Sequence, residues 1–360
     1  MNKWTMALAA AGVVSLSSVA QAQEAAAGAN ALAASTTLSG YVSTSYTMVD
    51  GSSNSNTFRS GDDNDRFAVD VVDLKFASAQ GAGEYATGYT VELWAGPAAG
   101  DIGTEDATNA GTVELMQANI DLRLPVGNGL DIKLGQWGTT VGAETYNYNA
   151  NAFYSRSYGF QVEPTHHTGI LASYQLSDDL GVAVGVANDT TDAGINDRGS
   201  SGSAYIFGAN YTLPDSTGFA GGTTITYGGV IDAGADATDK NNHYFGVSVP
   251  LPVEGLSYNL AWDIVENNGN ADDNVVGHYL SYALNDKATV NVRYEHGNIN
   301  SNIDGSSGNE NLDGLESITV GLDYALWENV TSRIEFRTDD WDGKTTSADE
   351  SMTVNIIYSF

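Results

Sequence analysis

Three charged residues in one long polar and aromatic stretch are the groups most able to act on a passing solute. Glu144, Arg156 and Glu163 lie between Gly138 and His166, among many Tyr, Asn and Gly residues. Opposite charges facing one another across a narrow water-filled passage create a transverse field that orders water and filters ions. The stretch therefore predicts ion filtering and not bond chemistry, provided that the surrounding segments supply partner charges.

Partner charges occur at alternating positions of strand-like segments. The candidates for a lumen wall are Lys75, Arg123, Lys133, Arg293, Arg333, Arg337, Asp73, Glu92, Asp121, Asp131, Asp263, Glu295, Asp323 and Glu335. A lipid-facing Lys or Arg near mid-membrane costs roughly 2–4 kcal/mol, so membrane-crossing strands would turn these side chains inward. The competing interpretation is that they form ion pairs within the wall, and for any single residue we favour it.

Other chemistry has less support. His166 and His167 are adjacent, so on a strand their side chains point to opposite faces and do not easily chelate one ion. We expect a structural role for them and no metal site. The acidic runs Asp62–Asp65 and Asp189–Asp192 lack the glycine and the final glutamate of an EF-hand loop, which favours solvated loops over divalent-cation sites.

Catalytic motifs are missing from the sequence. It contains no Gly-x-Ser-x-Gly elbow and no His-Glu-x-x-His run, the local patterns of common hydrolases and metalloproteases. We expect no enzyme and no cofactor.

The elements that must position the charges are sixteen strand-like segments. In the last, Met352, Val354 and Ile356 alternate with Thr353 and Asn355, as side chains on opposite faces of a strand do. The segments are 37–49, 66–78, 83–95, 112–124, 129–137, 167–176, 180–188, 203–212, 223–233, 242–250, 255–267, 273–284, 287–298, 315–326, 329–339 and 350–360.

The connections between these segments alternate between short and long. Outer-membrane barrels have short periplasmic turns, long outer loops and an even strand count, whereas a sandwich with Greek-key crossings does not order its loops in this way. We predict an all-β fold, a transmembrane antiparallel up-and-down β-barrel of sixteen strands, or fourteen if two segments are false. A soluble β-sandwich that binds a ligand is the alternative.

The beginning of the chain predicts export. Residues 1–22 have a positive start, a short apolar run and an Ala-x-Ala site, the features of a secretory signal peptide. Residues 23–36 form a lead-in segment without an assigned role, and residues 37–360 form the barrel. The net charge of −31 argues against nucleic-acid binding and predicts that cations are attracted to the mouth of a channel.

Aromatic residues gather near the segment ends. Amphipathic rings favour the boundary between membrane and water, and ordinary strand preference explains a part of the pattern. The candidates are Tyr41, Tyr46, Trp94, Trp137, Tyr174, Tyr211, Trp262, Tyr282, Tyr294, Trp327 and Tyr358.

Strand number connects this fold to transport. Eight-stranded barrels are filled by side chains, whereas sixteen to eighteen strands enclose an aqueous channel. We expect the loop of about residues 138–166 to fold into the bore and narrow it. The rings of Tyr146, Tyr148, Phe153, Tyr154 and Tyr158 then either pack the loop to the wall or line the path.

Local motifs in this loop resemble a known family. Gly135–Thr139, Gly142–Glu144, Asn151–Tyr158, Pro164 and His167–Gly169 are similar to the OmpL-like β-barrel porins of Gram-negative bacteria. The resemblance covers about forty residues and implies a porin-like channel in the cell outer membrane, among lipid and lipopolysaccharide. Tyr358 and Phe360 resemble the C-terminal signal that the barrel-assembly machinery reads. A homotrimer is expected by analogy with sixteen-stranded porins.

These observations favour a passive porin for small hydrophilic solutes and ions, with a preference for cations. A carbohydrate-selective channel, in which aromatic rings stack on sugars, is one alternative. A closed barrel with a structural or adhesive role is another.

Overall fold

The protein is a barrel of sixteen antiparallel strands. The computed structural model describes residues 35–50, 65–102, 113–188, 203–232, 240–267, 271–300, 312–342 and 349–360. The strands are β1 (Thr37–Asp50), β2 (Arg66–Ser78), β3 (Thr87–Ala95), β4 (Val113–Leu124), β5 (Leu130–Gly138), β6 (His166–Gln175), β7 (Leu180–Ala187), β8 (Ala204–Thr212), β9 (Thr224–Asp232), β10 (Lys240–Pro250), β11 (Leu256–Asn267), β12 (Asp273–Asn285), β13 (Ala288–Ile299), β14 (Leu312–Trp327), β15 (Val330–Asp340) and β16 (Asp349–Ser359).

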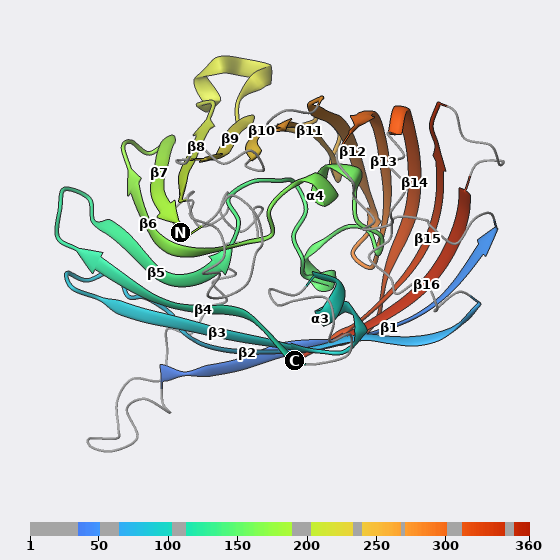
Figure 1. Cartoon of the computed structure of the whole chain (residues 1–360), viewed down its shortest axis with the longest axis horizontal. Coiled ribbons are helices and arrows are strands. Elements are labelled where there is room, and N and C mark those ends of the chain that lie inside the picture. The colour runs from blue at the N-terminus through green and yellow to red at the C-terminus, as the bar shows by residue number, and fades with distance from the viewer. Residues whose placement is uncertain are drawn as a thin grey trace.

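Each strand pairs with its neighbours in the sequence, and β16 returns to β1 (Figure 1). At this closing seam Gly40 and Phe360 exchange two backbone hydrogen bonds of 3.0 Å. Closure leaves no strand edge without a partner, as a sheet in hydrocarbon requires. The predicted sixteen-stranded antiparallel barrel is confirmed, and the fourteen-stranded version is wrong.

The exposure of the strands is the reverse of that in a soluble sheet. In β16 the polar Ser351, Thr353 and Asn355 are buried, whereas Met352 and Ile356 are 39% and 42% exposed. Apolar rows on β14 and β15 are exposed in the same way. A sandwich would bury its apolar rows between two sheets, so the alternative of a soluble sandwich is wrong. The apolar face points outward, toward lipid.

Turns set the exact ends of the strands. β3 begins at Thr87 and not near residue 83 as predicted, because Tyr85 has a positive φ of 58° that a regular strand does not allow. At the short turn between β14 and β15, Asn329 has a φ of 64°. Asn is among the residues that tolerate this left-handed region best.

Two connections carry short helices inside the ring of strands (Figure 1). The one after β3 contains α3 (Pro97–Ile102), and the one between β5 and β6 contains η2 (Tyr148–Ala150) and α4 (Tyr158–Val162). Ser157 caps α4 by accepting a 3.0 Å hydrogen bond from the Phe160 N–H. A fourth short helix, η3 (Asp215–Ala220), connects β8 to β9. No helix in the described ranges combines the length and the apolarity needed to span a membrane.

Some predictions fall on other parts of the chain. The predicted signal peptide, residues 23–34 of the lead-in, Asp62–Asn64 and the run Asp189–Asp192 lie outside the described residues. The proposed domain boundaries and the role of these acidic runs stay predictions.

Candidate functional site

The connection between β5 and β6, which we call the inner loop (residues 139–165), is held to the wall by Arg293 of β13. This guanidinium contacts Glu144 of the loop at 2.6 Å and Glu295 of its own strand at 3.1 Å. It also donates hydrogen bonds of 3.0 Å to the carbonyl and to the hydroxyl of Ser155. Charge-assisted bonds of this kind are the strong ones. Arg293 therefore connects two carboxylates and the loop backbone at a single point.

Neighbouring wall charges bind the loop through its backbone. Glu335 accepts hydrogen bonds from the N–H groups of Tyr154, at 2.6 Å, and Ser155, at 3.1 Å. Arg333 donates to the carbonyl of Asn151 at 2.7 Å, and Arg337 donates to that of Arg156 at 2.6 Å.

On β13, the Glu295 carboxylate accepts a 2.7 Å hydrogen bond from the N–H of Tyr158. The five wall residues that hold the loop in this way are at most 3% exposed. We call them the anchor cluster, and they are Arg293, Glu295, Arg333, Glu335 and Arg337.

Arg156, predicted as a constriction charge, is enclosed by the loop itself. It is 1% exposed and donates to the carbonyls of Tyr154, at 3.1 Å, and Tyr146, at 2.6 Å. Its guanidinium lies 4.4 Å above the Tyr148 ring, within the range of a cation–π contact. The positive charge shapes the loop and does not meet water.

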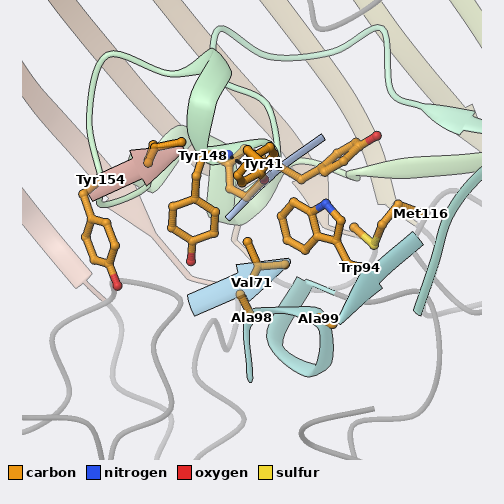
Figure 2. Packing of buried hydrophobic residues seen from close by; sticks show 11 residues of the cluster. Tyr41, Val71, Trp94, Ala98, Ala99, Met116, Tyr148 and Tyr154 are labelled. Carbon is orange, nitrogen blue, oxygen red and sulfur yellow. Dashed lines mark hydrogen bonds between the residues drawn. The ribbon is translucent and has the colours of Figure 1, made fainter. Parts of the chain in front are cut away.

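Aromatic rings fasten the loop to a second part of the wall, on β1 to β4. Trp94 of β3 lies 5.4 Å from Tyr146 and 6.1 Å from Tyr148, measured between ring centroids. Figure 2 shows Trp94 beside Val71 and the two alanines of α3, with Tyr148 and Tyr154 next to each other. Burial, reinforced by the nearby Glu92 charge, raises the pKa of the Tyr146 hydroxyl well above its ordinary value.

All five loop rings named from the sequence, including Phe153 and Tyr158, are at most 4% exposed. Phe153 lies under the Arg293 guanidinium at 4.8 Å, and Tyr158 lies under that of Arg337 at 4.9 Å. Of the two roles left open by the sequence, packing the loop to the wall is the one that this burial supports.

Asp70 is a contact residue of the loop that the sequence analysis missed. Its carboxylate accepts hydrogen bonds from Ser43 at 2.7 Å, Ser45 at 2.6 Å and the Tyr154 hydroxyl at 2.8 Å. The register between β1 and β2 shifts at this point, which marks a bulge. A bulge inserts one extra residue and changes which face the following side chains occupy. Alternation counted from Asp73 therefore assigns Asp70 to the wrong face.

Tyr41, Trp94 and Trp137 correct a second expectation. They were predicted as rings at the membrane boundary, but each is at most 1% exposed and packs inside the barrel. Alternation along the strand predicts the inward position of Trp94, because Trp94 is two residues from Glu92 and lies on the same face of β3. Others of the predicted set do lie on the outer surface, namely Tyr211, Trp262, Tyr282, Trp327 and Tyr358.

The far end of the loop rests on two carboxyl groups. Glu163, which closes α4, is hydrogen-bonded to Asp263 of β11, and the two residues are 7% and 3% exposed. Burial, together with the charge of Asp263, raises the pKa of Glu163 well above its ordinary value. Gly142 has a φ of 100°, and a Cβ at this position would overlap the Glu163 carboxylate.

Four wall charges on β4 and β5 lie away from the inner loop. Lys133 contacts Asp121 at 2.6 Å, and Arg123 contacts Asp131 at 3.0 Å. Their side chains are 17–39% exposed. We call these residues the β4–β5 pairs.

The remaining predicted wall charges are also paired or covered. Lys75 contacts Glu92 at 3.2 Å, and Asp323 contacts Arg333 at 2.7 Å. Asp73, opposite Tyr41 in the register, is buried. Cross-strand pairing puts the fourteen predicted wall residues on the inner face of the barrel, part of which the loop covers. Whether they act on a solute stays a prediction.

The adjacent histidines at the end of the loop have separate environments. His166 contacts the Thr165 hydroxyl at 2.8 Å and lies 4.5 Å from the Tyr146 ring, whereas His167 contacts the Thr139 hydroxyl at 2.8 Å. In the described ranges, no three acidic, His or Cys side chains are grouped so as to hold a metal ion.

Small uncharged side chains make up the accessible surface of the loop. Its charged and aromatic members are buried, and every second residue from Ala143 to Asn149 remains accessible. The partly or fully exposed members are Thr139, Thr140, Ala143, Thr145, Asn147, Asn149, Ala150, Ala152 and Gln161.

Comparisons with known proteins agree with this geometry. The trimer form of in-vitro folded OmpT, an outer membrane protein of Vibrio cholerae, superposes with a TM-score of 0.59 at 11% identity, over 90% of this chain and 99% of that one. The outer membrane channel DcaP of Acinetobacter baumannii gives 0.60 at 11% identity, over 90% and 97%. OccD3 (OpdP) of Pseudomonas aeruginosa gives 0.52 at 14% identity, over 90% and 91%. No curated protein sequence matches.

At these identities the solved structures establish the fold. The family model named Putative beta-barrel porin-2, OmpL-like, matches residues 35–360, a range that includes every described residue. The resemblance inferred from the loop motifs is therefore confirmed, and so is a location in the outer membrane of a Gram-negative bacterium. With its closed barrel and its wall of inward charges, the chain belongs to the OmpL-like β-barrel porin-2 family.

Proposed function

We propose that the protein is a passive channel for small hydrophilic solutes and ions, narrowed by the inner loop. The observation that carries this proposal is the attachment of the loop to two separate parts of the barrel wall. The anchor cluster binds its backbone from β13 to β15, and Trp94 packs its rings from β3. A loop held at so many points keeps one shape, and a fixed constriction is the feature that sets the size limit of a pore.

The path that this loop leaves is lined by neutral groups. Its accessible side chains are alanine, threonine, asparagine and glutamine, whereas Glu144, Arg156 and Glu163 are buried. These three residues therefore act on the shape of the constriction more than on the field inside it. Hydroxyl and amide groups can replace part of the hydration shell of a polar solute without selecting its charge.

A preference for cations then arises away from the loop. The chain carries a net charge of −31, and clefts of one sign raise the local concentration of the opposite ion. The β4–β5 pairs, which are partly exposed, are the wall charges best placed to modify this effect. We propose a modest cation preference, which salt screening would weaken.

Planar-bilayer recording under a salt gradient tests these statements together. Replacing residues 144–160 by a short Gly/Ser linker is expected to raise single-channel conductance, because the barrel wall remains and the constriction is gone. The Lys133→Met variant, in which the loop is intact, is the matched control and should keep its conductance close to that of the unchanged protein. Unchanged conductance after loop replacement would contradict the constriction, and anion selectivity would contradict the cation preference.

The rival functions make different predictions in the same recording. A closed structural or adhesive barrel gives no conductance at all. A sugar channel that works by stacking needs accessible rings, and the five rings of the loop are buried. Sugars can be added to test this alternative by their block of the current. If the block persists in the Tyr148→Leu variant, aromatic rings other than Tyr148 must bind the sugar.

Assembly is the remaining part of the proposal. One similar structure is the trimer form of OmpT, which supports a homotrimer here. Tyr358 and Phe360 lie exposed at the closing seam, where an assembly factor can reach them, and lipid and lipopolysaccharide would surround the outer apolar rows. Native mass spectrometry of the detergent-folded protein measures the oligomeric state directly.

A further inference from the structure

The contact between Glu163 and Asp263 is unlike the others that hold the loop. In the anchor cluster each carboxylate meets a guanidinium or an N–H group, but here two carboxyl groups are hydrogen-bonded to each other. Glu163 Oε2 and Asp263 Oδ1 are buried and have no hydrogen-bond partner among the described residues. Two carboxylates in contact in a buried place cannot both ionise, so the pair holds a proton.

The surroundings of the pair offer no compensating positive charge. Arg293 is engaged by Glu144 and Glu295, and these two glutamates add to the negative potential at Glu163. From β10, Tyr244 faces both carboxyls and brings no charge while it is protonated. Among the described residues, no ion pair reaches Glu163 or Asp263.

The backbone is shaped to bring these two carboxyls together. Gly142 and Gly159 leave space where a Cβ would meet the Glu163 carboxylate and Asp263 Oδ2. The short helix α4 packs against β11 and β12, and Glu163 is its C-terminal cap. The pair thus links the C-terminal end of α4 to β11, while Glu295 of β13 binds the N-terminal end through the Tyr158 N–H.

We propose that Glu163 and Asp263 form a shared-proton site that keeps the α4 end of the inner loop docked, and that loss of this proton releases that end. The inference deepens the proposed function, since a released loop widens the path only if the loop constricts it. Two groups are too few for a metal site, in keeping with the absence of larger clusters in the described ranges. The proton is the ligand that fits.

The direction of the pH effect follows from the pKa of Glu163. Docking raises this pKa above its ordinary value of 4.5, so the docked state binds more protons than the released one. Docking is then fully favourable below the ordinary value and weakens as pH rises through the raised one. Glu144 and Glu295 act in the same direction, because their charges oppose ionisation of the pair.

Thiol labelling measures release without relying on conduction. The chain contains no cysteine, so Val162→Cys reports on the buried α4 and Ala150→Cys on an exposed site of the same loop. The ratio of their labelling rates with a hydrophilic maleimide removes the pH dependence that the two thiols share. We expect this ratio to rise between about pH 5 and about pH 9, and to stay constant in a Glu163→Gln background, where an amide keeps the hydrogen bond to Asp263.

Further variants and recordings decide between outcomes. Asp263→Asn should also remove the pH response, whereas Asp178→Asn, in an exposed turn, should leave it intact. A ratio that does not change with pH, or that rises equally with Glu163→Gln, overturns the inference. Conductance should rise over the same pH range. A labelling response without a conductance response supports the proton site and contradicts the constriction.

Discussion

Two regions of the inner wall carry the same kinds of charged residue in very different surroundings. The anchor cluster on β13 to β15 is at most 3% exposed and is bound to the inner loop, whereas the side chains of the β4–β5 pairs are 17–39% exposed. A buried charge that loses its partner is costly, but an exposed pair is worth little because water replaces it. Position on the wall, and not residue type, therefore separates charges that hold the loop from charges that remain partly exposed.

Removal of Arg293 should have the largest effect. Arg293→Met leaves Glu144 and Glu295 buried without their partner, and breaking a buried ion pair in this way costs about 3–5 kcal/mol. We expect a lower unfolding midpoint in detergent and noisy, enlarged conductance. An unfolding midpoint and a conductance close to those of the unchanged protein would contradict the distinction between the anchor cluster and the β4–β5 pairs.

Glu335→Gln should come next. The amide keeps one acceptor for the N–H groups of Tyr154 and Ser155 but loses the negative charge, and a bond to a charged group contributes about 1.5–3 kcal/mol. We expect an intermediate loss of stability in denaturant titration. A loss as large as that of Arg293→Met would mean that the anchor cluster acts as one unit and not as separate contacts.

Tyr154→Phe tests the other wall. It deletes the 2.8 Å hydrogen bond to Asp70 and keeps the buried ring, so we expect a loss of about 1 kcal/mol, the typical value of one hydrogen bond. Thermal unfolding measures this value. Phe153→Leu is a matched comparison, because it changes packing without removing a hydrogen bond.

Lys133→Met should change stability least, by less than about 1 kcal/mol, as for exposed ion pairs in general. It leaves Asp121 partly exposed and without its 2.6 Å partner, which should shift the reversal potential toward stronger cation preference. Asp121→Asn should shift it the other way. Equal reversal potentials for the two variants would show that the β4–β5 pairs lie outside the ion path.

The closing strand β16 illustrates how much of the fold could be predicted from the sequence. Alternation of Met352 and Ile356 with Thr353 and Asn355 predicted its two faces, and both are as predicted. The same rule would put Asp70 on the outer face, since the bulge in β2 adds one residue to the count. Bulges depend on how two strands meet, and no property of the isolated segment reveals them.

The loop motifs show a second limit. The sequence predicted that Glu144, Arg156 and Glu163 share one polar and aromatic loop, and the resemblance they carry identified the family correctly. It did not predict that Arg156 binds backbone carbonyls inside the loop, or that Glu163 meets Asp263, about a hundred residues away. Such contacts depend on how the loop enters the barrel.

By itself, then, the sequence determined the barrel. Strands with one apolar and one polar face, joined by turns of alternating length, have a single low-energy arrangement in a bilayer, in which every backbone group is paired and the apolar rows meet lipid. Only the tertiary structure decided which inward charges remain in contact with water. Burial is a property of what packs against a residue, and in this protein that is a loop whose anchoring residues come from strands far away in the chain.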